Sequence, residues 1–191
     1  NTVLTQEVKD SVWANTYNTG DILDMVDLEY IADSIVDENG SADFWVSTPE
    51  QLASATYYIN ELDVDSETVS EVYFYIHLMN DIDLSGYRWA SIGNLKMNKH
   101  SGSEAAYRHQ FRGVFYGNGY TIKNLYVVNN GEGGSFINVS NYSTIVGLTL
   151  YDPIYNGYGD DFVYALTSKH TNYTQVVDCK VLVAEDKLDW I

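Results

Sequence analysis

The sequence has little cysteine, proline and positive charge, and these shortages exclude several classes of protein. With one cysteine, Cys179, among 191 residues, no intrachain disulfide framework and no multi-cysteine metal site can form. Ten basic residues face 27 acidic ones, and the net charge of -17 opposes binding to nucleic acid or anionic lipid. No apolar run approaches the ~18 residues of a membrane span. The first residues also lack the features of a secretion signal, so we expect a secreted form to have lost its signal.

The remaining composition is that of a folded chain with an uneven charge. Hydrophobic residues make up 45% of the sequence, enough for one domain with a real core. Residues 1–91 hold 18 acidic and 2 basic side chains, whereas residues 92–191 hold 9 and 8. The 17 tyrosines are typical of β structure and also of binding surfaces. Both interpretations of the tyrosines stay open.

Helices are expected before a long β region. Residues 21–36 place apolar side chains at helical spacing, and a shorter helix is possible within 1–18. After a strand at 44–47, Thr48-Pro49-Glu50-Gln51 has the pattern of a capping box with proline at the first helical position. This pattern predicts a helix over 49–60 with five inward residues: Leu52, Ala53, Ala55, Tyr58 and Ile59.

The β region repeats one apolar pattern, h-x-x-h-x-h, at variable intervals. The four matching runs are Met79/Ile82/Leu84, Ile122/Leu125/Val127, Ile145/Leu148/Leu150 and Val176/Cys179/Val181. A repeat of 20–30 residues with insertions is typical of a β-solenoid, in which coils stack and share a core. In that repeat Cys179 takes the position of Leu125 and Leu148, so we expect it to be a buried, unreactive side chain.

Residues 44–150 resemble a family of bacterial cell-surface proteins. Residues 78–86 and 89–93 are followed at 111–125 by F-x-G-x-F-x-G-N-G-x-T-I-x-N-L. This series is similar to the repeat region of proteins that carry GLUG-type repeats, as is the helix start at Thr48 to Leu52. Ala90 replaces a common proline, and the downstream G-L-F-G is changed to Gly134-Ser135-Phe136-Ile137. The resemblance implies a right-handed parallel β-helix in a secreted or wall-anchored protein, and implies little about its ligand.

Within the motif, the residue types favour a structural role. Gly117-Asn118-Gly119 tolerates the positive φ that a sharp corner between coils requires, and Asn124 can hydrogen-bond along the stack. Asp81 and Asp83 lie two apart and therefore point to one face of a strand. They are expected to be structural, with a paired-carboxylate or calcium site as the alternative.

A long insertion at 94–110 interrupts the pattern and is the candidate binding loop, since loops of this length are often functional. The residues that we expect to contact a ligand are Lys96, Lys99, His100, Tyr107, Arg108 and His109. Two hypotheses stay open: the basic loop binds a ligand, or it packs on the acidic first half and neutralises it.

Cofactor and catalytic signals are weak. Asp63, Asp65 and Glu67 resemble the start of a calcium loop but lack its later glycine and bidentate glutamate. Besides the alternative at Asp81 and Asp83, they are the candidate metal site, and no cofactor other than calcium is expected. The four histidines show no metal-ligand spacing, and no catalytic residues are assigned.

The sequence as a whole predicts a mainly β protein: a short right-handed parallel β-helix with an α-helical N-terminal cap. We expect residues 1–43 to form the cap and residues 44–191 the β-helix domain, together one unit. A fragment of a longer surface protein is an alternative that the sequence leaves open. The expected function is extracellular, non-enzymatic binding of a glycan or a host or cell-wall protein through the 94–110 loop and exposed tyrosine rows, or display as a stalk. Neither nucleic acid nor membrane insertion is expected. The alternative is a polysaccharide-active lyase or hydrolase, since such enzymes also use this scaffold.

Overall fold

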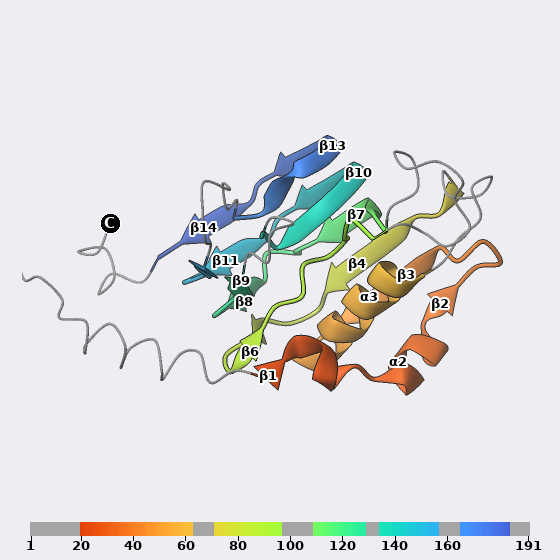
Figure 1. Cartoon of the computed structure of the whole chain (residues 1–191), viewed down its shortest axis with the longest axis horizontal. Coiled ribbons are helices and arrows are strands. Elements are labelled where there is room, and N and C mark those ends of the chain that lie inside the picture. The colour runs from red at the N-terminus through yellow and green to blue at the C-terminus, as the bar shows by residue number, and fades with distance from the viewer. Residues whose placement is uncertain (1–19, 63–70, 97–108, 129–133, 157–164, 184–191) are drawn as a thin grey trace, which may run out of the picture.

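The chain forms a parallel β-solenoid of about three turns, which confirms the predicted mainly β solenoid class (Figure 1). The structure is a computed structural model that describes residues 20–62, 71–96, 109–128, 134–156 and 165–183. Among these residues no helix is both long and apolar enough to cross a bilayer.

The coils contribute strands to three faces. The first face is the largest, with the parallel order β3 (Ala42–Val46), β4 (Phe74–Leu78), β7 (Phe111–Tyr116), β10 (Ile137–Val146) and β13 (Thr167–Val177). The second face stacks β5 (Ile82–Asp83), β8 (Thr121–Lys123), β11 (Thr149–Tyr151) and β14 (Lys180–Leu182). The third face pairs β9 (Tyr126–Val128) with β12 (Ile154–Asn156), and Trp89 bridges to Val127.

The register between coils aligns apolar side chains into buried columns. Ile82, Ile122 and Leu150 are direct partners on the second face and are at most 1% exposed. On the first face Ile76, Phe115 and Ile145 align in the same way and are fully buried. Burying such a side chain stabilises the fold by roughly 1.5–3 kcal/mol, so these columns are the core of the molecule.

The repeat in the sequence is real, but its predicted alignment is partly wrong. Ile145 pairs with Val176 and Leu150 with Val181, as expected. Ile122, however, pairs with Leu150 rather than occupying the position of Ile145. The reason is that the same spacing occurs at different corners: Ile145/Leu148/Leu150 leads from the first face to the second, whereas Ile122/Leu125/Val127 leads from the second face to the third.

Two further residues of the repeat depart from their expected environment. Met79, expected in the core, is 48% exposed because it follows β4 at the outside of a corner. Cys179 lies in register with Leu148, as predicted, but is only half-buried, with its Sγ 3.5 Å from the carbonyl oxygen of Ile145. Its strands β13 and β14 have a neighbouring coil on one side only within the described part of the chain.

The single helix expected over 21–36 is wrong, and the helical cap expected over 1–43 is not confirmed. Residues 1–19 lie outside the described part. The next segment divides into a 3-10 turn η1 (Ile22–Met25), a short helix α2 (Leu28–Asp33) and strand β2 (Ile35–Val36). The Asp27 carboxylate accepts hydrogen bonds from the backbone N–H groups of Glu29 and Tyr30, which starts a new helix at that point. β2 then pairs antiparallel with β3.

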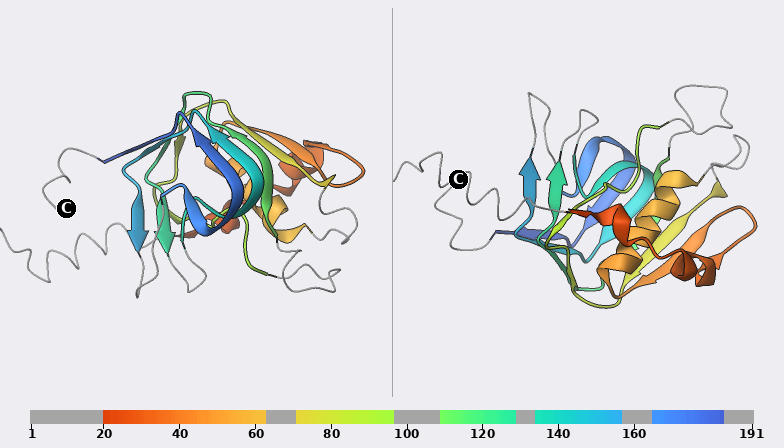
Figure 2. Two further views of the ribbon diagram at one scale, coloured as in Figure 1. Left: turned by 90° about the horizontal axis from the view of Figure 1, so that it is seen from above. Right: turned by 60° about the horizontal axis from the view of Figure 1, so that its bottom comes forward.

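The helix predicted over 49–60 is confirmed as α3 (Pro49–Glu61), and it packs against the N-terminal end of the solenoid (Figure 2). Thr48 accepts a hydrogen bond from the N–H of Gln51, and the Gln51 side chain accepts one from the N–H of Ser47. Of the five expected inward residues, Tyr58 is half-buried. The other four are buried: Leu52, Ala53, Ala55 and Ile59.

Within the described residues, the predicted boundary between a cap (1–43) and a β-helix domain (44–191) does not divide the structure into two units. The boundary at 43/44 falls inside β3. Ile22 is fully buried in the same core cluster as the α3 residues and the coils. The Ser54 hydroxyl of α3 also accepts a hydrogen bond from the N–H of Asp27, at 2.8 Å.

Gly113 and Gly119 of the motif both have a backbone conformation that is strained for other residues, but only Gly113 lies in a crowded environment. Both have positive φ, +117° at Gly113 and +80° at Gly119. A Cβ on Gly113 would lie 2.1 Å from the carbonyl oxygen of Phe74 on the neighbouring coil, whereas a Cβ on Gly119 meets nothing within 4 Å.

We predict that Gly119→Ala lowers the free energy of unfolding by about 1–2 kcal/mol, the cost of a left-handed conformation. Gly113→Ala adds a clash with backbone that cannot move aside, so its loss should exceed that of Gly119→Ala by at least about 1–3 kcal/mol. Urea denaturation of the two variants measures the difference. Equal losses would contradict the close approach of β4 and β7.

Candidate functional site

A polar cleft of about 310 Å³ lies beside the first coil and is the candidate site. It is bordered by the pairing of β1 (Gly20–Asp21) with β6 (Tyr87–Arg88), by the C-terminal end of α3 and by the segment that follows β6. The lining residues are mostly polar: Asp21, Asn60, Arg88, Trp89, Ala90, Ser91, Gly93, Asn94, Lys96, Val128 and Asn138.

The two strands β1 and β6 position an ion pair at one side of the cleft. Asp21 lies opposite Arg88 in the parallel register. One carboxylate oxygen of Asp21 accepts from the N–H of Leu23 at 3.0 Å, which caps η1, and the other accepts from Arg88 Nη2 at 2.8 Å. The backbone therefore fixes Asp21, and Asp21 holds the Arg88 guanidinium at the cleft.

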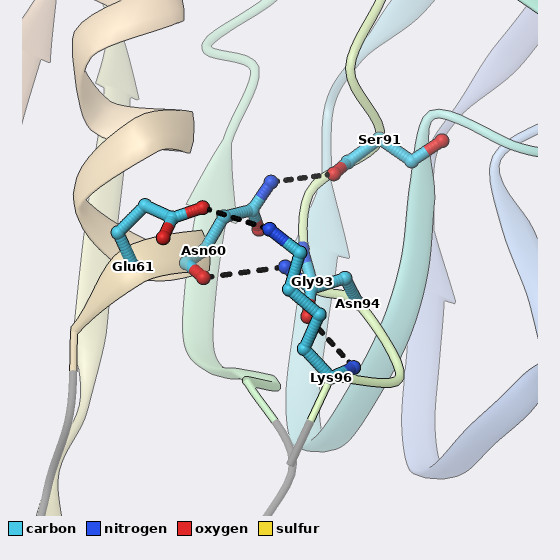
Figure 3. A network of polar contacts seen from close by, with 6 residues as sticks. All are labelled: Asn60, Glu61, Ser91, Gly93, Asn94 and Lys96. Atoms are coloured by element: carbon cyan, nitrogen blue, oxygen red, sulfur yellow. Dashed lines mark hydrogen bonds and ion pairs between the residues drawn. The ribbon is translucent and has the colours of Figure 1, made fainter. Parts of the chain in front are cut away.

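Asn60 near the end of α3 ties the helix to the first coil (Figure 3). Its Nδ2 donates to the carbonyl oxygen of Ser91 at 3.0 Å, and its Oδ1 accepts from the N–H of Gly93 at 2.7 Å. The Asn94 side chain returns a bond of 3.2 Å to the Asn60 carbonyl oxygen. Asn60 is 7% exposed, and its bond to Gly93 is buried while the other two are partly buried. Bonds with this little exposure to water keep the floor of the cleft rigid.

Lys96 lies at the other side of the cleft, and both its backbone and its side chain have polar partners. Its backbone N–H donates to Asn94 Oδ1 at 3.0 Å, and its Nζ lies 3.2 Å from a carboxylate oxygen of Glu61. Glu61 is the last residue of α3, where a cation is also favoured by the helix dipole. The N–H of Asn94 donates to the carbonyl oxygen of His109 at 2.7 Å, so the two ends of the 94–110 insertion meet beside the cleft.

Of the two expected ligand-contact residues that the structure describes, one lines the cleft and the other does not. Lys96 lines the cleft, whereas His109 does not and is only 8% exposed. The other four lie outside the described residues: Lys99, His100, Tyr107 and Arg108. Sequence reasoning missed Arg88, although it is one of two basic residues in the first 91, and it missed Asn60, which looks like an ordinary helix residue.

Asp81 and Asp83, the alternative carboxylate pair, are engaged in the stacking of coils. Asp81 accepts a hydrogen bond of 2.8 Å from the N–H of Thr121 on the next coil. Asp83 accepts bonds from Asn124 Nδ2 at 2.8 Å and from the N–H of Ser85 at 2.9 Å. The predicted role of Asn124 along the stack is thereby confirmed. Partial burial of Asp83 raises its pKa, but these hydrogen bonds and the nearby Lys123 outweigh it, so the pKa is lowered overall.

The candidate calcium site cannot be located, because Asp63, Asp65 and Glu67 fall in 63–70, outside the described residues. Across the ranges that are described, no group of three or more histidine, cysteine, aspartate or glutamate side chains is placed to hold a metal ion.

Aromatic rings form two columns on the outside of the first face. Trp45, His77 and Tyr116 are direct partners on β3, β4 and β7, with ring centroids 4.9 and 4.7 Å apart. In such a column each ring covers the face of the next. The rings thus stabilise the contact between coils and present mainly their edges to water.

The second column combines tyrosines with a cation. The Arg112 guanidinium lies 5.4 Å from the centroid of the Tyr73 ring and 5.2 Å from that of Tyr142, and Tyr142 stacks on Tyr173 at 4.7 Å. Tyr142 and Tyr173 both have φ near +50° (49° and 48°) within the long strands β10 and β13, and these strands are strongly curved (Figure 2). These exposed tyrosines are the structural counterpart of the tyrosine rows expected from the sequence.

Comparison with family models, with curated proteins and with solved structures finds no match to the chain. The functional inference therefore depends on the geometry of the cleft and the columns.

Asn60 offers a test of the rigid floor. Asn60→Ala leaves the Gly93 N–H and the Ser91 carbonyl without their partner, which costs about 1–3 kcal/mol per buried group. Alanine is also the better helix former, so any loss comes from the missing bonds. We predict a loss of at least about 1 kcal/mol in the free energy of unfolding by urea, whereas the exposed Asn39→Ala should change it by less than about 0.5 kcal/mol. Equal stability of the two variants would contradict the network.

The lowered pKa of Asp83 predicts a pH dependence of stability. A carboxyl group whose pKa in the folded state lies below its ordinary value of 3.8 stabilises the fold above that pH, and the contribution is lost as pH falls through the folded-state pKa. The stability advantage of the wild type over Asp83→Asn should therefore shrink between pH 5 and pH 2.5, by urea denaturation at each of about six pH values.

Glu38→Gln, on an exposed turn, controls for the loss of one negative charge in the same series. A constant advantage of the wild type over Asp83→Asn down to the lowest pH would show that the Asn124 and Ser85 bonds do not favour the ionised carboxylate.

Proposed function

We propose that the chain is a non-enzymatic, extracellular binding domain of a bacterial surface protein, and that its cleft takes part of a glycan. The observation that carries the proposal is the cleft of about 310 Å³ with a preorganised polar floor. Ligand-binding pockets typically have volumes of about 300–1,000 Å³, so the cleft is at the small end of this range. The resemblance of residues 44–150 to surface proteins with GLUG-type repeats supports the location, and the rarity of left-handed parallel crossovers supports right-handed winding.

The chemistry of the lining suits a sugar. Saccharides present many hydroxyl groups, each of which needs a donor or an acceptor when it leaves water. The cleft offers amide, hydroxyl and charged side chains from Ser91, Asn94, Arg88 and Lys96. The floor is held by the Asn60 bonds before any ligand arrives, so little conformational entropy is lost on binding.

A polysaccharide-active enzyme is the second candidate. Glycoside hydrolases use two carboxyl groups about 5–9.5 Å apart, whereas Asp21 is the one carboxylate among the described residues that line the cleft. Asp21 is also bonded to Arg88 and Leu23. The two cations in the cleft favour a lyase more than a hydrolase, since positive charge can stabilise the carboxylate of a uronic-acid substrate as a proton is removed beside it.

A glycan array combined with degradation assays on neutral and uronic-acid polysaccharides tests the proposal. We predict binding to at least one glycan without release of shorter products. Ala90→Trp places a large side chain in the lining and should abolish binding, while Gln175→Trp, on the outer surface of β13, should not.

Thermal unfolding shows whether each variant is folded before binding is compared. Product release would support the enzyme instead. Binding that survives in folded Ala90→Trp would move the site away from the cleft, and the absence of binding to any glycan would favour a stalk.

A further inference from the structure

Positive charge is scarce in residues 20–96, and it is concentrated at the cleft. Residues 20–96 contain two basic side chains, Arg88 and Lys96, and both line the cleft. They come from different parts of the chain, β6 and the start of the 94–110 insertion, and they are paired with different carboxylates, Asp21 and Glu61. In a chain with a net charge of -17, these two ion pairs make the cleft locally neutral where most of the surface is negative, so an anion is repelled less there.

The remaining hydrogen-bonding capacity of the cleft belongs mainly to these cations. The amide group of Asn60 bonds to Ser91 and Gly93, and the Ser91 hydroxyl donates to the carbonyl oxygen of Ser135 at 2.6 Å. A guanidinium has five N–H donors and an ammonium has three. Within the described part of the chain, Arg88 donates one bond to Asp21 and Lys96 Nζ donates one to Glu61. Both groups therefore keep donors for a ligand.

The existing ion pairs do not block an incoming anion. The side chains of Arg88 and Lys96 are 52% and 64% exposed, and exposed ion pairs contribute little, about 0–1 kcal/mol each. Asp21 also stays anchored through the N–H of Leu23 when Arg88 turns to a ligand. A carboxylate could accept two parallel bonds from the guanidinium, which is the strongest arrangement available to either partner.

From these observations we propose that the glycan bound in the cleft is acidic, with a sugar carboxylate between Arg88 and Lys96 and neighbouring hydroxyl groups against the polar floor. This inference depends on the proposed function and adds the ligand class. The negative charge of the rest of the chain repels anions in general, so recognition requires the carboxylate and the sugar ring together.

The test uses the whole chain and a panel of short oligosaccharides of galacturonic, glucuronic and N-acetylneuraminic acid, each paired with its methyl ester. The esters keep the sugar and remove the charge. Isothermal titration calorimetry should show binding of at least one acid, with its ester at least about tenfold weaker. Arg88→Gln and Lys96→Gln should each weaken binding of that acid by about tenfold. Lys180→Gln on β14, which removes the same charge far from the cleft, should leave it unchanged.

Each other outcome overturns the inference. Equal affinity for acid and ester, lost in Ala90→Trp, would leave a glycan-binding cleft without the preference for acid. Binding of neutral glycans alone would do the same. Binding of an acid that neither Arg88→Gln nor Lys96→Gln weakens would place the carboxylate elsewhere. Failure of every acidic, esterified and neutral glycan to bind would remove the proposed function as well.

Discussion

Backbone hydrogen bonds between successive coils keep like side chains in register, and the core depends on that register. A single coil cannot bury its apolar side chains, because the neighbouring coils supply the atoms that cover them. The molecule shows this within one column. Ile122 and Leu150 have coils on both sides and are fully buried, whereas Val181, which pairs with Leu150 on the outermost described coil, is 40% exposed. The polar bonds from Asp81 and Asp83 to the next coil strengthen the same register at the corners.

The stacking also creates the candidate site, although the site lies at its flank. The third face is short, so the segment after β6 is held by Trp89 against Val127 and by Asn60 of α3 rather than by a long ladder. This leaves a cleft between the helix and the coil. Each of its two cations is paired with one carboxylate and exposed on the remaining side. The rigidity comes from the hydrogen bonds of the buried Asn60 side chain, and the binding capacity comes from the exposed cations.

The extent to which the sequence predicts this structure depends on how local each signal is. α3 was predictable because its cap, its proline and its apolar face all lie within a few residues. The solenoid was predictable from the repeat, but the alignment of Ile122 was not, since the same spacing marks different corners in different coils. The stripe over 21–36 suggested a helix, but Asp27 offers a second helix start and Ile35 pairs with Asp43 of β3, which sequence periodicity does not show. The cleft was half predictable: Lys96 lies in the singled-out insertion, whereas Asp21 and Arg88 are 67 residues apart and meet only through the pairing of β1 and β6.

Native-state hydrogen exchange at the Gly93 amide tests most directly whether stacking and the helix together build a rigid site. The Gly93 N–H donates to the buried Asn60 Oδ1 at 2.7 Å, so its exchange requires opening of the contact between α3 and the first coil. We expect protection close to that of the amides of β7, which has a coil on each side. Exchange at the rate of an exposed loop amide would show that the cleft is not preorganised, and would contradict this account of the site.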